Sequence, residues 1–200
     1  MKTQITNILN LTSSPKRIIS LVPSQTELLV DLGFEKNIVG VTKFCIHPSS
    51  LKKTKAIVGG TKNINIKKIK ELNPDIILCN KEENTKEIVE ACQQIALTHV
   101  SDLYTLNDTK NLIKEYGEIF DCKIKSNKVL EKLNFLQNDF QEFIKNKASK
   151  KVAYFIWKTP WMVAADNTFI NHILELNKFD NAFKNLKRYP EINIEEINQN

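Results

Sequence analysis

The sequence predicts an α/β protein of two Rossmann-like lobes with parallel sheets, joined by one long backbone helix. In residues 123–147, apolar side chains recur every three or four positions and no Gly or Pro intervenes, which predicts a single amphipathic helix. The segments before and after this run both open with a basic pair and an apolar strand, followed by a loop with Pro and a helix. A pattern of Asn-Ile, two charged residues and Ile occurs at 65–69 and again at 193–197. These features indicate two related lobes.

Strands alternate with helices in the first lobe. We expect strands at 18–22, 39–42, 57–58, 75–79 and 98–100, a short edge strand at 4–11, and helices at 25–32, 66–72, 85–96 and 107–120. Ser24 followed by Glu27 is typical of a capping box at the start of the first helix, and Gly33 predicts its end. The alternation predicts a parallel sheet that helices cover on both faces.

The long helix divides the chain into three parts. We expect an N-terminal α/β lobe at 1–122, a linking helix at 123–149 and a C-terminal α/β lobe at 150–200. In the last part, an apolar strand at 150–157 leads past Pro160 to a helix that ends at Asn177.

Composition is that of an ordinary globular protein, with 42% hydrophobic and 26% charged residues. The net charge of +6 comes mostly from scattered Lys, and isoleucines interrupt the densest cluster, at 62–70. This pattern favours a solvated helix face over a nucleic-acid interface. No stretch is apolar enough to cross a bilayer, so no membrane insertion is expected.

The start of the chain lacks an apolar signal segment, which predicts a cytoplasmic location. A true start further upstream would instead allow a periplasmic or cell-surface location. The four Cys are widely spaced and match neither a zinc motif nor a disulfide framework. Cys79 and Cys92 lie in an apolar strand and a helix, so both are predicted to be buried thiols.

Ligands of such sheets bind beyond the carboxyl ends of the strands. The loops expected there are Pro23-Ser24-Gln25, Phe44 to His47, Asn80-Lys81 and Trp157 to Trp161. Two tryptophans in a loop with Pro suit the wall of a cleft for a flat or bulky ligand. Packing within the second lobe explains them equally well.

His47 and Cys45 lie two positions apart in one of these loops. A neutral imidazole beside a thiol is able to ligate a metal, but two candidate ligands do not make a site. A Cys45 nucleophile served by His47 lacks an orienting third group. An ordinary loop before Pro48 is the simplest interpretation.

Five ordered segments resemble the cobalamin- and iron-siderophore-binding proteins of ABC importers, a group with a helical backbone. These segments are residues 17–27, 39–41, 58–61, 72–77 and 157–183. The resemblance implies two lobes on one rigid helix, with a single ligand held in the cleft between them. Relatives continue for several elements beyond the equivalent of residue 200, so the second lobe is expected to be incomplete and to expose apolar surface.

The resemblance also implies a set of cleft residues. Cobalamin-binding relatives place aromatic side chains at the positions of His47, Tyr189 and the Gly60-Thr61 region; here His47 is a possible axial ligand for cobalt or haem iron. Stacking on Trp157, Trp161 and Tyr189 is expected to supply binding energy. The full predicted set is Ser24, Gln25, Phe44, His47, Gly60, Thr61, Asn80, Lys81, Trp157, Trp161 and Tyr189.

Importer-docking members carry a surface Glu on each lobe, at positions that correspond to Lys67 and Glu195. Lys67 reverses the charge, which disfavours the usual permease contact. We expect a non-enzymatic solute-binding protein that holds cobalamin, haem or a ferric chelate as cargo and needs no cofactor. The alternatives are a cytosolic thiol- or metal-dependent enzyme using Cys45 and His47, and a ligand-free interaction module with a Lys-rich face.

Overall fold

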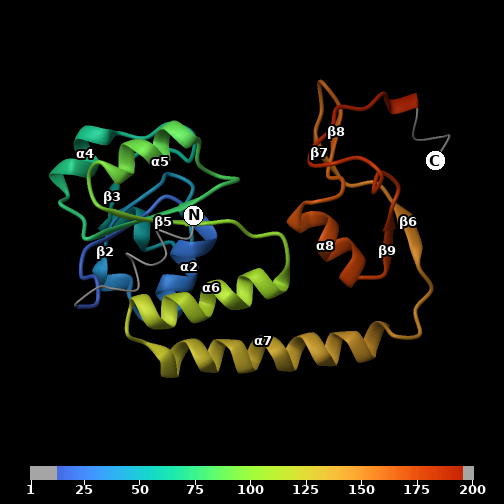
Figure 1. Ribbon diagram of the computed structural model, residues 1–200, viewed down its shortest axis with the longest axis horizontal. Coiled ribbons are helices and arrows are strands. Elements are labelled where there is room, and N and C mark those ends of the chain that lie inside the picture. Colours follow the sequence, from blue (N-terminus) through green and yellow to red (C-terminus); the bar gives the residue numbers. More distant parts are fainter. Residues whose placement is uncertain (1–12, 196–200) are drawn as a thin grey trace. The chain divides into compact units, whose positions relative to one another are not determined.

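The computed structural model describes residues 13–195 (Figure 1). The edge strand expected at 4–11 lies outside this range. Contacts divide the chain into two compact units. The first unit comprises the described residues up to Asp102 together with Asn111–Val129, and the second comprises Leu103–Lys110 and the described residues from Leu130 onward. The predicted lobe boundaries at 122 and 149 stay a prediction.

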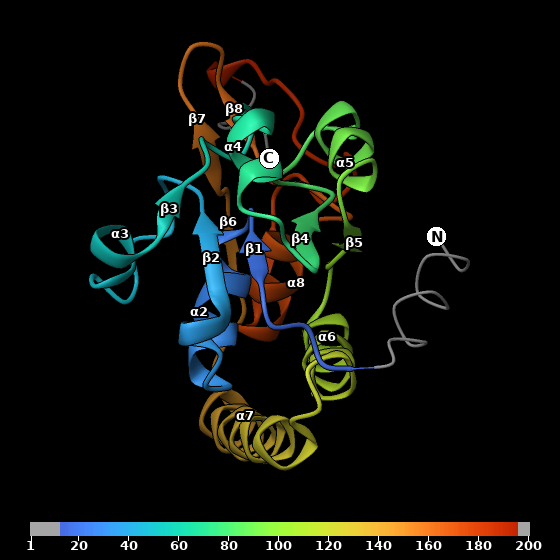
Figure 2. The same ribbon diagram turned by 90° about the vertical axis from the view of Figure 1, so that its left-hand side faces the viewer.

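The first unit contains a five-stranded sheet in the order β3-β2-β1-β4-β5, in which every pairing is parallel (Figure 2). Its strands are β1 (Ile18–Ser20), β2 (Ile38–Val41), β3 (Ala56–Ile57), β4 (Ile76–Asn80) and β5 (Leu97–Ser101). Ile18 lies opposite Ile38 on one side and Ile76 on the other. Every residue of β1 and β4 is buried, as expected for strands covered on both faces. The predicted parallel sheet is confirmed.

Helices cover this sheet: α4 (Ile66–Glu71) and α5 (Lys86–Gln93) lie on one side, and α2 (Pro23–Asp31) and α6 (Leu106–Ile119) on the other (Figure 1). A short α3 (Leu51–Thr54) precedes β3. The core beneath α4 and α5 includes Ile19, Ile77, Cys79 and Cys92. Both thiols are fully buried, which confirms their predicted place.

The start of α2 differs from the sequence prediction. The helix begins at Pro23, its N-cap is Val22, and no side chain caps it, so the Ser24 capping box was wrong. The fixed φ of Pro suits the first helical position, and this places Ser24 inside the first turn. Gly33 ends the helix at φ +87, as predicted.

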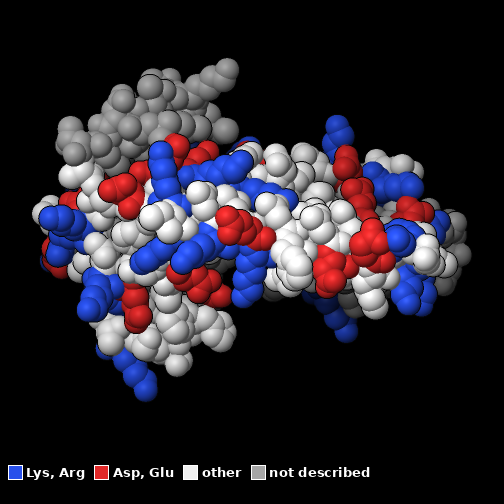
Figure 3. Space-filling view, turned by 90° about the horizontal axis from the view of Figure 1, so that it is seen from below, with Lys and Arg blue, Asp and Glu red and all other residues white. Residues whose placement is uncertain are grey.

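The long helix α7 (Lys123–Ile144) is unbroken over 22 residues, which confirms the predicted backbone helix. It begins in the first unit and ends in the second. Ser126 and Leu130 are buried, whereas Phe135 and Phe143 are about two-thirds exposed. Basic and acidic side chains are intermingled on the face that Figure 3 shows, without a large patch of one sign.

The second unit has a smaller framework than the first. It contains β6 (Lys150–Val152), β7 (Phe155–Trp157), β8 (Met162–Val163), α8 (Phe169–Leu176) and β9 (Phe179–Asn181). β6 pairs with β9 in parallel, and β7 pairs with β8 antiparallel. The strand expected at 150–157 is therefore two strands, because the chain changes its pairing partner after Val152. The Val152 carbonyl accepts a hydrogen bond from Ala182 N, whereas the Tyr154 carbonyl accepts one from Ala164 N.

The core of this unit centres on Val163, Ala165 and Phe183. Apolar side chains remain at its surface: Trp157 is 63% exposed and Tyr154 47%. In the described part of the second unit, two strands pair in parallel, whereas the parallel sheet of the first unit has five. Over residues 13–195, no helix combines the length and apolarity needed to span a membrane.

Candidate functional site

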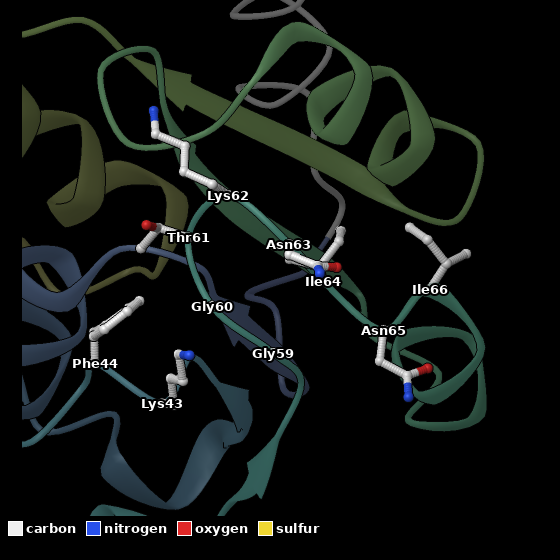
Figure 4. A pocket seen from close by; sticks show the side chains of 10 residues that line it. All are labelled: Lys43, Phe44, Gly59, Gly60, Thr61, Lys62, Asn63, Ile64, Asn65 and Ile66. Atoms are coloured by element: carbon white, nitrogen blue, oxygen red, sulfur yellow. The ribbon is translucent and has the colours of Figure 1, made fainter.

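A hollow of about 770 Å³ opens beyond the carboxyl ends of β2 and β3 in the first unit. The loops that follow these two strands form most of its lining (Figure 4). Its residues are Lys43, Phe44, Gly59, Gly60, Thr61, Lys62, Asn63, Ile64, Asn65 and Ile66. Of the predicted ligand contacts, the structure brings Phe44, Gly60 and Thr61 together here.

A tight turn after β3 shapes one wall of the hollow. Gly60 N donates to Asn63 O at 2.7 Å, and Gly59 O accepts from Lys43 N at 2.7 Å. Gly59 has φ +123, and a Cβ there would lie 2.5 Å from the Asn63 carbonyl oxygen. Only glycine fits this position, so the turn depends on it.

Gly60 lets an aromatic ring approach the backbone. A Cβ on Gly60 would lie 3.2 Å from Phe44 Cε2 and 3.5 Å from Lys43 Cε. The Phe44 ring is half-exposed and the Lys43 ammonium lies 5.1 Å from its centroid. An apolar surface is thus presented beside a positive charge.

Two hydrogen bonds from Asn84 connect this wall to the end of β4. Its Nδ2 donates to the Thr61 carbonyl at 3.0 Å, and its Oδ1 accepts from Asn80 N at 2.9 Å. Asn84 is 3% exposed and Thr61 8%. The sequence analysis placed Asn84 only in a polar loop. The pattern that could have revealed its hydrogen bonds is its position four residues after Asn80, the polar last residue of β4.

Asn80 and Gln25 engage the protein itself. Asn80 Oδ1 accepts from Glu82 N at 2.8 Å and its Nδ2 donates to Ser101 Oγ at 2.9 Å. Gln25 Nε2 donates to the same Ser101 hydroxyl, and Gln25 Oε1 accepts from Tyr116 Oη at 2.7 Å. Both residues are almost fully buried, and the partners of both side-chain amides lie in the first unit.

Burial, and to a lesser degree the neighbouring Cys79 and Glu115, raise the pKa of Tyr116 well above its usual value. Its hydroxyl therefore stays protonated and able to donate to Gln25. Nearby, Lys81 Nζ pairs with Asp102 Oδ2 at 2.7 Å, directly after β5. The other Asp102 oxygen is buried without a hydrogen-bond partner among the described residues.

Ser24, His47 and Cys45 do not line the hollow. Ser24 is exposed on the first turn of α2, and His47 is exposed in the loop before α3. Cys45 is 1% exposed, with its sulfur 3.2 Å from Thr26 Oγ1 and 3.3 Å from the Thr42 hydroxyl. Within residues 13–195, no three His, Cys, Asp or Glu side chains gather as a metal site would require.

The remaining predicted residues belong to the second unit. Trp161 packs edge-on against Phe155 at 5.3 Å between centroids, with the Lys158 ammonium 5.5 Å from the Trp161 ring. Trp157, at the end of β7, is largely exposed. Tyr189 is partly buried and lies 5.5 Å from the Arg188 guanidinium. Backbone bonds from Val163 N to Pro190 O and from Ile192 N to Trp161 O bring these segments together.

A family model described as periplasmic binding protein matches residues 18–200. The chain belongs to the periplasmic binding protein family. Two curated relatives agree. YvrC of Bacillus subtilis, an uncharacterized ABC transporter substrate-binding lipoprotein, is 28% identical over 84% of this chain and 55% of YvrC. A vitamin B12-binding protein of Vibrio vulnificus is 24% identical over 91% of this chain and 67% of that protein.

A solved structure shares the fold of this chain. A periplasmic heme binding protein of Pseudomonas aeruginosa superposes with a TM-score of 0.83 at 20% identity, over 92% of this chain and 68% of that chain. The predicted fold class, with α/β lobes and one backbone helix, is confirmed. The chain spans between about half and two thirds of the length of the curated relatives named above.

The cytoplasmic location expected from the sequence is not supported. The family is described as periplasmic, and YvrC is named a lipoprotein. That expectation depended on where the sequence starts, which does not decide the location of the protein.

Proposed function

We propose that this chain binds a metal chelate, such as a corrinoid, a haem or a ferric siderophore, as the solute-binding component of an ABC importer. The relatives' names support this class of cargo, since they include vitamin B12 and heme. The observation that carries the proposal is the hollow beyond β2 and β3, where the half-exposed Phe44 ring stands over the Gly60 backbone.

The hollow has the properties of a preformed ligand site. Its wall is fixed by the Gly59–Asn63 turn and by the Asn84 bond to Thr61, so little ordering is left to be done when a ligand binds. A half-exposed aromatic ring favours a flat or bulky apolar ligand surface, because burying the exposed part of the ring is favourable. Such a site recognises the organic framework of a metal chelate.

His47, three residues after Phe44, remains our proposed axial ligand for a bound cobalt or iron, because its exposed imidazole is accessible. Ser24, Gln25, Asn80 and Lys81 remain proposed contacts, with Gln25 and Asn80 acting through their neighbours. Trp157, Trp161 and Tyr189 remain proposed stacking residues.

Absorption titrations with cyanocobalamin, haemin and a ferric trihydroxamate test the proposal. We expect a saturable band shift with at least one of them, which Phe44→Ala weakens by about tenfold through the loss of aromatic burial. Gly60→Leu places a bulky side chain against the Phe44 ring, where even a Cβ would lie 3.2 Å from Phe44 Cε2, and should abolish the shift. Phe135→Ala removes another exposed phenylalanine, from α7, and serves as the control. If none of these chelates shifts its bands, the proposal is wrong.

We also propose that the protein works outside the cytoplasm and docks on a permease through surfaces that include Lys67 and Glu195, both exposed. Lys67 calls for an acidic partner residue, because like charges at an interface lower affinity. Lys67→Glu should then weaken docking on its own permease, measured by ATPase stimulation in vesicles. An increase in stimulation would contradict this part of the proposal.

A further inference from the structure

We propose that the hollow selects ligands with anionic oxygen atoms, such as carboxylated tetrapyrroles or ferric catecholate and carboxylate chelates, over neutral corrinoids. This inference rests on the proposed function and narrows its ligand class.

The hollow carries positive charge without an opposing carboxylate. Lys43 and Lys62 both belong to its lining, and no Asp or Glu does. In the part of the chain that the structure describes, neither ammonium forms a salt bridge. The nearby Lys81 differs, because Asp102 pairs with it at 2.7 Å. Two uncompensated charges are therefore left for a ligand.

The two ammonium groups are placed by their surroundings. Figure 4 shows Lys43 and Lys62 on either side of the Gly60-Thr61 backbone. Lys62 Nζ donates to the Glu82 carbonyl at 2.6 Å, which orients the group and uses one of its three donors. Lys43 lies beside the Phe44 ring. A chelate resting on that ring would bring its periphery to Lys43, and Lys62 adds a second positive charge across the Gly60-Thr61 backbone.

Charge then discriminates between ligand classes. Ammonium–oxygen interactions are stronger in a partly enclosed hollow than in bulk water, because the local dielectric is lower. A neutral chelate offers only neutral oxygen atoms, which accept weaker hydrogen bonds, and it displaces water from the ammonium groups. Anionic chelates should therefore bind more tightly, and their affinity should fall as salt is added.

The test compares probes of different charge on the same chain. Haemin and a ferric tris-catecholate are anionic, whereas a neutral ferric trihydroxamate and cyanocobalamin are not. We expect the anionic probes to bind at least about tenfold more tightly, and Lys43→Gln and Lys62→Gln each to weaken only those probes, by about tenfold. Lys52→Gln, an exposed lysine on α3 outside the hollow, should change nothing.

The outcomes separate this inference from the proposed function. Equal or tighter binding of the neutral probes, or lysine variants that leave anionic binding unchanged, would overturn the charge selection while leaving chelate binding intact. No binding by any probe would overturn both. Both substituted lysines are exposed, so unchanged circular dichroism is expected to confirm that the variants fold.

Discussion

Asn84 is the side chain on which the wall of the hollow most depends. Asn84→Ala removes the donor to the Thr61 carbonyl and the acceptor for Asn80 N. Thr61 borders the open hollow, so we expect water to replace part of the hydrogen bond that its carbonyl loses. The Asn80 amide, in a residue that is 7% exposed, has no such replacement.

The expected cost follows from these two groups. A buried polar group without a partner costs about 1–3 kcal/mol, and partial hydration of one of the two brings the expected loss to about 2–4 kcal/mol. For a chain of this size, that corresponds to a fall in Tm of about 4–16 °C. Binding of the cargo should weaken as well, since the wall loses its attachment.

Urea denaturation followed by circular dichroism measures the loss. Tryptophan fluorescence would not serve, because both tryptophans, Trp157 and Trp161, belong to the second unit. Asn63→Ala, an exposed asparagine on the same wall, is the matched control and should change stability by less than about 0.5 kcal/mol. A loss of that small size for Asn84→Ala would refute the reasoning.

Three further predictions concern single side chains. Gly59→Ala should cost at least about 2 kcal/mol, because φ +123 and the Asn63 carbonyl both exclude a Cβ; a denaturation midpoint equal to wild type would contradict this. Burial raises the pKa of Asp108, but hydrogen bonds from Thr105 and Tyr104 outweigh it and leave the pKa lowered. The stability that Asp108 contributes is thus present above the ordinary carboxyl pKa and is lost as pH falls through the lower folded value; Asp108→Asn should flatten this part of a stability–pH curve. Titration of thiols in the native protein should modify Cys122 alone, because the other three Cys are buried. Its rate of modification should increase with pH, because burial raises the pKa of the Cys122 thiol. Rapid reaction at a second Cys would contradict the observed burial.

Local patterns were sufficient for most of the first unit. The strands at 18–22 and 75–79 are apolar except for Ser20 and Asp75, and such runs between helices predict a covered parallel sheet. The backbone helix was predictable because its apolar spacing continues without Gly or Pro over six turns. These features depend on neighbours in sequence, which the sequence displays directly.

Side-chain partners were less predictable because they lie far apart in sequence. Gln25 follows a strand, as a ligand contact would, yet its partners Ser101 and Tyr116 are 76 and 91 residues away. Lys62 was assigned to a solvated helix face with the rest of 62–70, whereas the turn after β3 directs it to the hollow. The split between β6 and β7 was missed for the same reason, since each pairs with a different later strand.

The central claim is that the hollow beyond β2 and β3 holds a metal chelate. A ferric ligand broadens the NMR signals of nearby amides, so adding haemin to uniformly labelled protein locates the metal without a variant. We predict that broadening centres on residues 43–47 and 59–66 and is absent from Ile124 and Lys125 at the start of α7. Broadening that spares residues 59–66, or that centres on the start of α7, would contradict the account.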